Sequence, residues 1–202
     1  MSTEEGRKTD RRIVRTRAAI QEAFFRLLTT TRYEKITITA LANEANIDRK
    51  TFYTHYGSID ELLKDRMRAQ MNHMFDSASP HDLLSDPVSY TKRLLLASRD
   101  ALPSSQEDRR LIFENLPESK LVHAWISAGE ERITRELEVF PWSATTKSRM
   151  GALLDFYLGG IFNAYTSWLK SDSDLSFEEL VDLLSEGIVN GLTGMLSRHT
   201  MP

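Results

Sequence analysis

Apolar and polar residues follow a helical period along almost the whole chain. Apolar positions recur at spacings of three and four, whereas the alternation typical of a strand does not persist beyond residues 33–39. Prolines separate the helices, because a proline is disfavoured inside a helix and tolerated in its first turn. The pattern therefore predicts an all-α protein of about nine helices. The expected helices include residues 10–30, 58–75, 88–102, 118–140, 143–170 and 176–199, with two short ones between residues 36 and 56.

Residues 36–56 are the most informative segment, because they read as two short helices joined by a tight polar turn. Thr37 is a suitable N-cap for the first helix, which has apolar residues at i, i+3, i+4 and i+7 from Ile38 onward. Asn46 tolerates a left-handed turn, and Asp48 can cap the second helix. That helix opens with arginine, lysine and threonine, as suits the major groove of DNA. The alternative is an ordinary helical corner with a solvated charged face.

The first expected helix begins at Asp10, as its N-cap, and ends at Thr30. It also carries much of the positive charge, beginning with the pair Arg11 and Arg12. The net charge is −3 overall, but residues 1–56 carry +4 and the remaining residues carry −7. Beside the two short helices, this basic excess favours contact with phosphates over a merely solvated helix start. The buried stripe of the helix is expected at Ile13, Ile20, Phe24 and Leu27.

Residues 11–64 resemble the DNA-binding domain of the tetracycline-repressor (TetR) family. Two departures stand out: Asn46 replaces the usual turn glycine, and Ile59 stands where many members have a lysine that contacts phosphate. The resemblance implies a helix-turn-helix domain at residues 10–57 and an effector-binding and dimerisation domain at 58–202. The likeness runs through Ile36-Thr37-Ile38, Leu41-Ala42, Thr51-Phe52-Tyr53, His55-Tyr56 and Glu61-Leu62-Leu63.

The resemblance further implies a homodimeric transcriptional regulator, more readily a repressor, that binds a pseudo-palindromic operator in double-stranded DNA. Arg49, Lys50 and Thr51 would face base edges, while Tyr53 and His55 would hold phosphates. The full set of implied DNA contacts is Arg11, Arg12, Thr37, Thr39, Arg49, Lys50, Thr51, Tyr53, Thr54 and His55.

The last two helices hold six of the nine glycines. Glycine inside a helix costs roughly 1 kcal/mol relative to alanine, so such a cluster needs a reason. Gly187, Gly191 and Gly194 lie at i, i+4 and i+7 and form one smooth stripe. The stripe fits either tight packing within a subunit or a dimer interface built as a four-helix bundle. The spacing favours the dimer, and the resemblance to TetR-type regulators strengthens that expectation.

Catalytic chemistry has no candidate in this sequence. The chain has no cysteine, its five histidines show no HExxH-like setting, and neither GxGxxG nor GxSxG occurs. We therefore expect no enzyme, no metal site and no cofactor. The chain has no apolar run long enough to span a membrane and no signal-peptide pattern, and a cytoplasmic protein is expected.

A ligand pocket needs only a cavity with a few polar groups, and the resemblance implies a small apolar or aromatic effector. The pocket is expected between the 113–125 region and the 156–168 helix, although core packing is the alternative for any one aromatic. A protein partner bound by this domain is the alternative to a small molecule. The candidate lining residues are Arg99, Phe113, Trp125, Phe156, Tyr157, Asn163, Tyr165 and Trp168.

Overall fold

The computed structural model describes residues 2–79, 81–100, 102–138, 141–171 and 174–199, without the side chains at 2–10, 83–84, 136–137, 154 and 192–199. These residues form ten α-helices, one 3-10 turn and no strand, which confirms the all-α prediction. The helices are α1 (Ser2–Leu28), α2 (Ile38–Glu44), α3 (Arg49–His55), α4 (Ile59–Asp76), α5 (Asp82–Ser85), α6 (Pro87–Asp100), α7 (Gln106–Asn115), α8 (Glu118–Glu138), α9 (Ala144–Lys170) and α10 (Phe177–His199), with the 3-10 turn η1 at Tyr33–Lys35.

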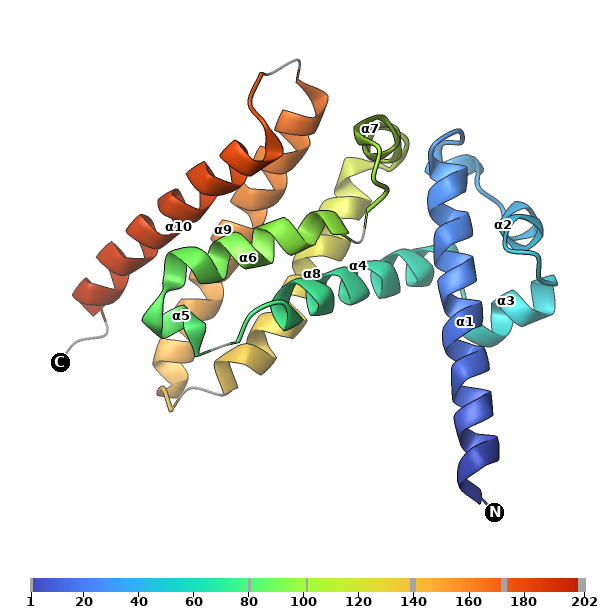
Figure 1. Ribbon diagram of the computed structural model, residues 1–202, viewed down its shortest axis with the longest axis horizontal. Helices are drawn as coiled ribbons and strands as arrows, with labels where there is room; N and C mark the ends of the chain where they lie inside the picture. Colours follow the sequence, from blue (N-terminus) through green and yellow to red (C-terminus); the bar gives the residue numbers. More distant parts are fainter. Residues whose placement is uncertain (1, 80, 101, 139–140, 172–173, 200–202) are drawn as a thin grey trace.

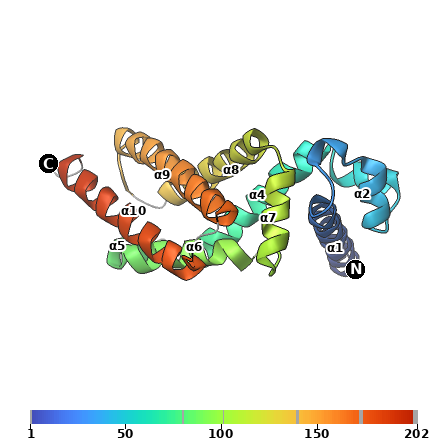
Figure 2. The same cartoon turned by 90° about the horizontal axis from the view of Figure 1, so that it is seen from above.

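Helices α1–α3 form one end of the molecule, which we call the head, and α4–α10 form the body (Figure 1). Helix α4 leads from the head into the middle of the body, where it packs against α6 and α8. Helices α9 and α10 lie at the end away from the head. In both views α7 lies between the rest of the body and α1 (Figure 2). The arrangement is therefore elongated, with the head and the last two helices at opposite ends.

Each short helix of the head starts at the cap that its sequence predicts. The Thr37 side chain accepts a hydrogen bond from the Ala40 amide at 3.1 Å. Asp48 accepts one from the Thr51 amide at 2.6 Å, and Ser58 caps α4 in the same way. These oxygens satisfy amides that have no partner within the helix, so the helix boundaries are set locally.

The turn between α2 and α3 depends on Asn46, whose φ of +53° is positive. Only glycine adopts this left-handed conformation freely, and asparagine tolerates it better than other side chains. The replacement of the usual turn glycine by Asn46 is therefore compatible with the tight turn. Ile59, the other departure from the TetR pattern, is partly buried against the hydrophobic core of the head.

The head is held together by side chains that are removed completely from water. Ile20 and Phe24 of α1 pack with Leu41 of α2, Phe52 of α3 and Leu62 of α4, and each of the five is 0% exposed. Full burial of one such side chain contributes roughly 1.5–3 kcal/mol. The same hydrophobic cluster continues through α4 into α7, α8 and α9, so the head and body share one core.

Three sequence expectations differ from the structure. Helix α1 begins at Ser2 rather than Asp10, since no proline or turn sequence interrupts the earlier residues. Ile13 was expected to be buried but is 42% exposed, because it lines an open groove between α1 and the start of α3. The four-residue α5 was not expected, which raises the number of helices in the described chain from about nine to ten.

None of the described helices combines the length and the apolar character that crossing a bilayer requires.

Candidate nucleic-acid interface and core cavity

All ten residues predicted to contact DNA reach the surface of the head. Thr51 and His55 are partly buried and the other eight are exposed, including Tyr53 at 50%. Four of the ten line one open groove of about 560 Å³, which runs between α1 and the turn that precedes α3. The groove is lined by Arg12, Ile13, Thr16, Asn46, Ile47, Asp48, Thr51, Thr54 and His55.

The electrostatics of this surface differ between His55 and the arginines around it. Burial lowers the pKa of the His55 imidazole, and the nearby positive charge of Arg17 lowers it further. The lowered pKa favours the neutral imidazole, which can take part in a hydrogen bond but carries no charge. Positive charge on this surface comes instead from Arg12, Arg49 and Lys50, which are exposed.

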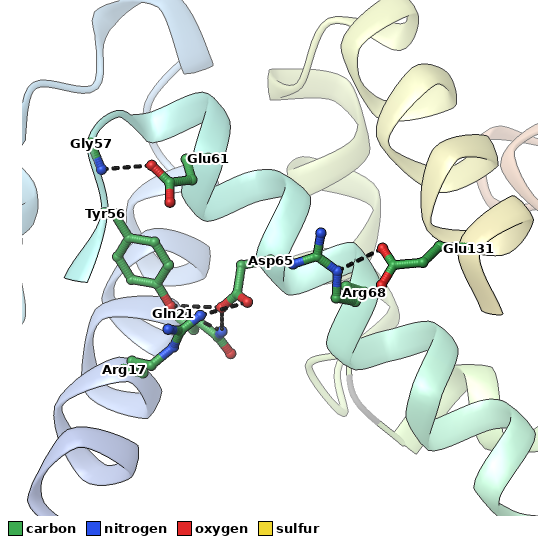
Figure 3. A network of polar contacts seen from close by, with 8 residues as sticks. All are labelled: Arg17, Gln21, Tyr56, Gly57, Glu61, Asp65, Arg68 and Glu131. Atoms are coloured by element: carbon green, nitrogen blue, oxygen red, sulfur yellow. Dashed lines mark hydrogen bonds and ion pairs between the residues drawn. The ribbon is translucent and has the colours of Figure 1, made fainter. Parts of the chain in front are cut away.

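Behind this surface, a network of polar contacts joins α1 and the end of α3 to α4 (Figure 3). The Asp65 carboxylate receives hydrogen bonds from Gln21 Nε2 and from Tyr56 Oη, each at 2.8 Å, and pairs with Arg17 Nη2 at 2.6 Å. The Arg17 guanidinium also lies over the Tyr56 ring, 5.0 Å from its centroid. The Asp65 network thus fixes the angle between the helix-turn-helix and α4.

A second set of contacts joins the head to α7 and α8. Asp60 at the start of α4 accepts a hydrogen bond from the Tyr33 hydroxyl and pairs with Lys120 Nζ at 2.7 Å. The Asn115 side chain donates a 2.8 Å hydrogen bond to the carbonyl oxygen of Leu28, the last residue of α1. A displacement of α7 would therefore act directly on the end of α1.

The body contains a cavity of about 60 Å³ whose lining is almost entirely apolar. Side chains from α4, α6, α7, α8, α9 and α10 line it, and Phe25 of α1 reaches it from the head. Its polar lining residues are Gln70, Ser98 and Tyr165. The Gln70 amide donates to the Ser98 carbonyl, but Gln70 Oε1 and Tyr165 Oη are buried without a hydrogen-bond partner among the described residues. Because unpaired buried polar groups are costly, these two atoms favour a cavity built for a ligand.

The predicted effector residues divide into three groups. Phe113, Trp125 and Tyr165 line the cavity, as expected. Arg99 and Trp168 lie just outside it, where both contact Phe177, a lining residue.

The remaining three predicted effector residues do not line the cavity. Phe156 is 72% exposed, Asn163 is exposed, and the partly buried Tyr157 does not line the cavity. The cavity face of α9 is formed instead by Ile161, Phe162 and Tyr165. Aromatic residues occupy both faces of α9, so periodicity alone did not identify the inner one.

Sequence reasoning also missed lining residues. Phe25 and Gln70 lie outside segments 113–125 and 156–168, between which the pocket was expected. Gln70 nevertheless carries a signal, since it interrupts the buried apolar stripe of Met67, Met71 and Met74 on α4 and is only 3% exposed.

The glycines of α9 and α10 do not form a uniform stripe. No atom lies within 4 Å of a Cβ placed at Gly160 or Gly187, whereas a Cβ at Gly191 would lie 2.4 Å from Tyr157 Oη in the same subunit. Gly191 thus permits a close approach inside the subunit, which was the alternative to a dimer interface at this position. The surroundings of Gly194 lie outside the described residues. Gly129 on α8, which was not predicted to matter, packs directly against Leu158 of α9.

Comparisons with known proteins agree with this architecture. No family model matches the chain. An uncharacterized HTH-type transcriptional regulator of Bacillus subtilis (strain 168), YxbF, is 32% identical over 105 residues. That match covers 50% of this chain and 28% of the relative, so the chain spans little more than a quarter of the length of that protein.

Two solved structures share the fold over nearly their whole length. The dihydroxyacetone kinase operon activator DhaS has a TM-score of 0.57 at 18% identity, covering 88% of this chain and 96% of its own. NalD, the secondary repressor of the MexAB-OprM multidrug efflux pump in Pseudomonas aeruginosa, has a TM-score of 0.52 at 16% identity, with coverages of 87% and 96%.

At sequence identities of 18% and 16%, the similarity to these two structures shows a shared fold. The chain therefore shares its fold with these two regulators: a helix-turn-helix head followed by a helical body. The fold that the resemblance of residues 11–64 to the TetR family implies is confirmed.

Proposed function

We propose that this chain is a dimeric, DNA-binding transcriptional regulator of the TetR type that represses its target and is released by a small effector. The observation that carries the proposal is the helix-turn-helix, in which the capped helix α3 opens with exposed Arg49 and Lys50. Residues 10–57 are the DNA-binding unit, and residues 58–202 bind the effector and form the dimer. The fold shared with an activator and a repressor supports the same class of function.

In this proposal α3 enters the major groove, where Arg49, Lys50 and Thr51 meet base edges. Arginine and lysine are suited to the O6 and N7 acceptors of guanine. The remaining contacts hold phosphates and set the position of the head without specifying sequence. They are Arg11, Arg12, Thr37, Thr39, Tyr53, Thr54 and His55.

The DNA-binding proposal is tested by selecting binding sites from a random duplex library and measuring affinity by fluorescence anisotropy. Arg49→Ala and Lys50→Ala should relax preference at particular bases, with a loss of roughly 1–3 kcal/mol for each good contact. His55→Ala should weaken binding to all sequences alike. Arg93→Ala is the matched control, since this exposed arginine of α6 pairs with Asp82 of α5 in the body. Unchanged base preference in both the Arg49 and Lys50 variants would refute base reading by α3.

The dimer is proposed to form through α9 and α10. Phe156 of α9 and Leu183 of α10 are 72% and 61% exposed, which is unusually high for large apolar side chains on a protein surface. Gly160 and Gly187 on the same helices have open space where a side chain would stand, so another backbone can approach closely. Two heads joined in this way must lie roughly 34–36 Å apart to reach successive major grooves.

Light scattering coupled to gel filtration tests the dimer. Gly187→Leu and Phe156→Glu should each give monomers with a folded head, because neither position is packed within the subunit. Val88→Glu is the matched control, since Val88 is an exposed apolar residue of α6 that is 38% exposed. Gly191→Leu is less informative, because it also meets Tyr157. Dimers that survive both test substitutions would exclude this face.

The effector is proposed to bind in the cavity of the body. Two unpaired polar atoms on residues that line the cavity support a small molecule over a protein partner, which would need a surface rather than a cavity. A ligand there would touch Phe25 of α1 and Gln70 of α4, and so could shift the head relative to the body. It releases DNA only through a difference in its affinity for the two arrangements.

A further inference from the structure

The cavity has a charged neighbour that the apolar lining does not explain. Ile112, Phe113 and Leu116 of α7 face the cavity, and Arg109 lies one turn earlier on the same side of the helix. The spacing of i, i+3, i+4 and i+7 places the four on a single stripe. Arg109 is 8% exposed, so a guanidinium occupies a position where the stripe calls for an apolar side chain.

Arg109 has no carboxylate partner among the described residues, and its Nε is buried without a hydrogen bond. Arg99, whose guanidinium lies over the ring of the lining residue Phe177, is by contrast paired with Glu178 at 2.6 Å. A buried donor without a partner is unfavourable, and proteins retain one mainly where it has a function. The guanidinium of Arg109 therefore has no anionic partner among the described residues.

Tyr165 packs against the cavity face of α7, because its ring centroid lies 5.6 Å from that of Phe113, one turn after Arg109. Tyr165 lines the cavity, and its hydroxyl is buried without a hydrogen-bond partner among the described residues. Burial raises the pKa of Tyr165, and the charges of Arg109 and Arg99 act against this rise. Arg109 and Tyr165 thus bring an unpaired cation and an unpaired hydroxyl donor to one end of an apolar cavity.

We propose that the effector is a small carboxylic acid whose carboxylate meets Arg109 and the Tyr165 hydroxyl while its apolar body fills the cavity. This inference rests on the proposed effector site and specifies the ligand that it takes. The planar guanidinium matches a carboxylate through two parallel hydrogen bonds. One uncompensated charge calls for a monoanion, and a phosphate dianion would leave negative charge unpaired.

The size of the cavity limits the apolar part of the ligand. A cavity of roughly 150 Å³ holds a benzene ring, so a cavity of about 60 Å³ is too small for an aromatic ring. This space suits a short branched chain. Gln70 lines the cavity, and its unpartnered Oε1 can accept a hydrogen bond from a hydroxyl on that chain.

The test uses the full chain and a panel of small branched acids: isobutyrate, isovalerate, pivalate and 3-hydroxyisovalerate. Each acid is paired with its neutral amide, and binding is read from the rise in Tm and from calorimetric titration. Acids should bind the wild-type protein at least tenfold more tightly than their amides. Arg109→Met should weaken acid binding by roughly 10–100-fold and leave amide binding unchanged, since it removes the charged hydrogen bonds. Tyr165→Phe should weaken acid binding by a smaller factor.

Two further readouts make the result decisive. Arg109→Met should raise the Tm of the ligand-free protein, because it replaces an unpaired buried charge with an apolar side chain of similar length. Arg110→Met, on the solvent side of the same helix, should change neither the Tm nor acid binding. The proposal is overturned if no acid in the panel binds, if acids and amides bind equally, or if Arg109→Met keeps the full acid affinity. DNA binding by the ligand-free protein is measured separately, so its loss would count against the regulator proposal and not against the anion site.

Discussion

Replacing Asp65 with asparagine should loosen the joint between the head and α4. The Asp65 carboxylate is 17% exposed and receives hydrogen bonds from Arg17, Gln21 and Tyr56. Hydrogen bonds to a charged group contribute roughly 1.5–3 kcal/mol each, and the cost of burying the carboxylate offsets part of that sum. The Arg17 side chain is 39% exposed, so its contribution is reduced by solvent screening. We expect a net loss of about 2 kcal/mol, which lowers Tm by roughly 4–8 °C in a chain of this length.

The pH dependence of this loss follows from the pKa of Asp65. Burial raises that pKa, but the hydrogen bonds from Arg17 and Tyr56 outweigh burial, and the pKa is lowered. A lowered pKa in the folded state adds stability above the unfolded value of about 3.9, and this stability is lost as the pH falls through the folded pKa. The difference in Tm between wild type and Asp65→Asn should therefore be complete at pH 6–7 and shrink below about pH 4.

Thermal unfolding followed by circular dichroism between pH 3 and 7 measures both effects. Glu131→Gln is the matched control, since it removes the Arg68–Glu131 pair on the other side of α4, whose side chains are 50% and 47% exposed (Figure 3). An exposed pair of this kind contributes at most about 1 kcal/mol. The reasoning is refuted if Asp65→Asn costs no more than Glu131→Gln, or if its effect is the same at every pH.

Three further predictions concern other contacts of the fold. Burial and the hydrogen bond to Asp65 raise the pKa of Tyr56 to about 12. The protonated Tyr56 therefore stabilises the fold fully below the unfolded pKa of about 10, and this stability is lost as the pH rises toward 12. Tyr56→Phe should flatten the fall of Tm between pH 9 and 12, and an unchanged slope would contradict this. In urea unfolding, Asn46→Ala should lower the stability by about 1–2 kcal/mol, whereas Asn46→Gly should be nearly neutral. The reason is that alanine is strained at a φ of +53° and glycine is not. Equal losses in the two variants would count against the left-handed turn. Gly129→Ala should lower Tm, because the new Cβ would lie 2.4 Å from Leu158 Cδ1. Gly151→Ala should raise the stability by roughly 0.5–1 kcal/mol, because its Cβ would meet no atom within 4 Å. A gain in both variants would show that α8 and α9 can move apart at no cost.

The head could be predicted from the sequence because its signals are local. The oxygens of Thr37, Asp48 and Ser58 cap amides only three residues away, and Asn46 sets its own turn. The buried stripe from Ile20 to Phe24 follows the helical period with no competing apolar face nearby. Where that period ran on without packing partners, as at Ile13, the prediction of burial was wrong.

The body required the tertiary structure because its site joins residues far apart in the chain. Periodicity places aromatic residues on both faces of α9 and does not say that Phe162 and Tyr165 turn inward while Phe156 faces solvent. Sequence shows that Gln70 and Arg109 interrupt apolar stripes on α4 and α7, but a stripe does not reveal whether a polar group finds a partner on another helix. Only the packing of α4, α6, α7 and α9 around one cavity decides that, because hydrogen bonding and desolvation depend on distances between helices rather than along them.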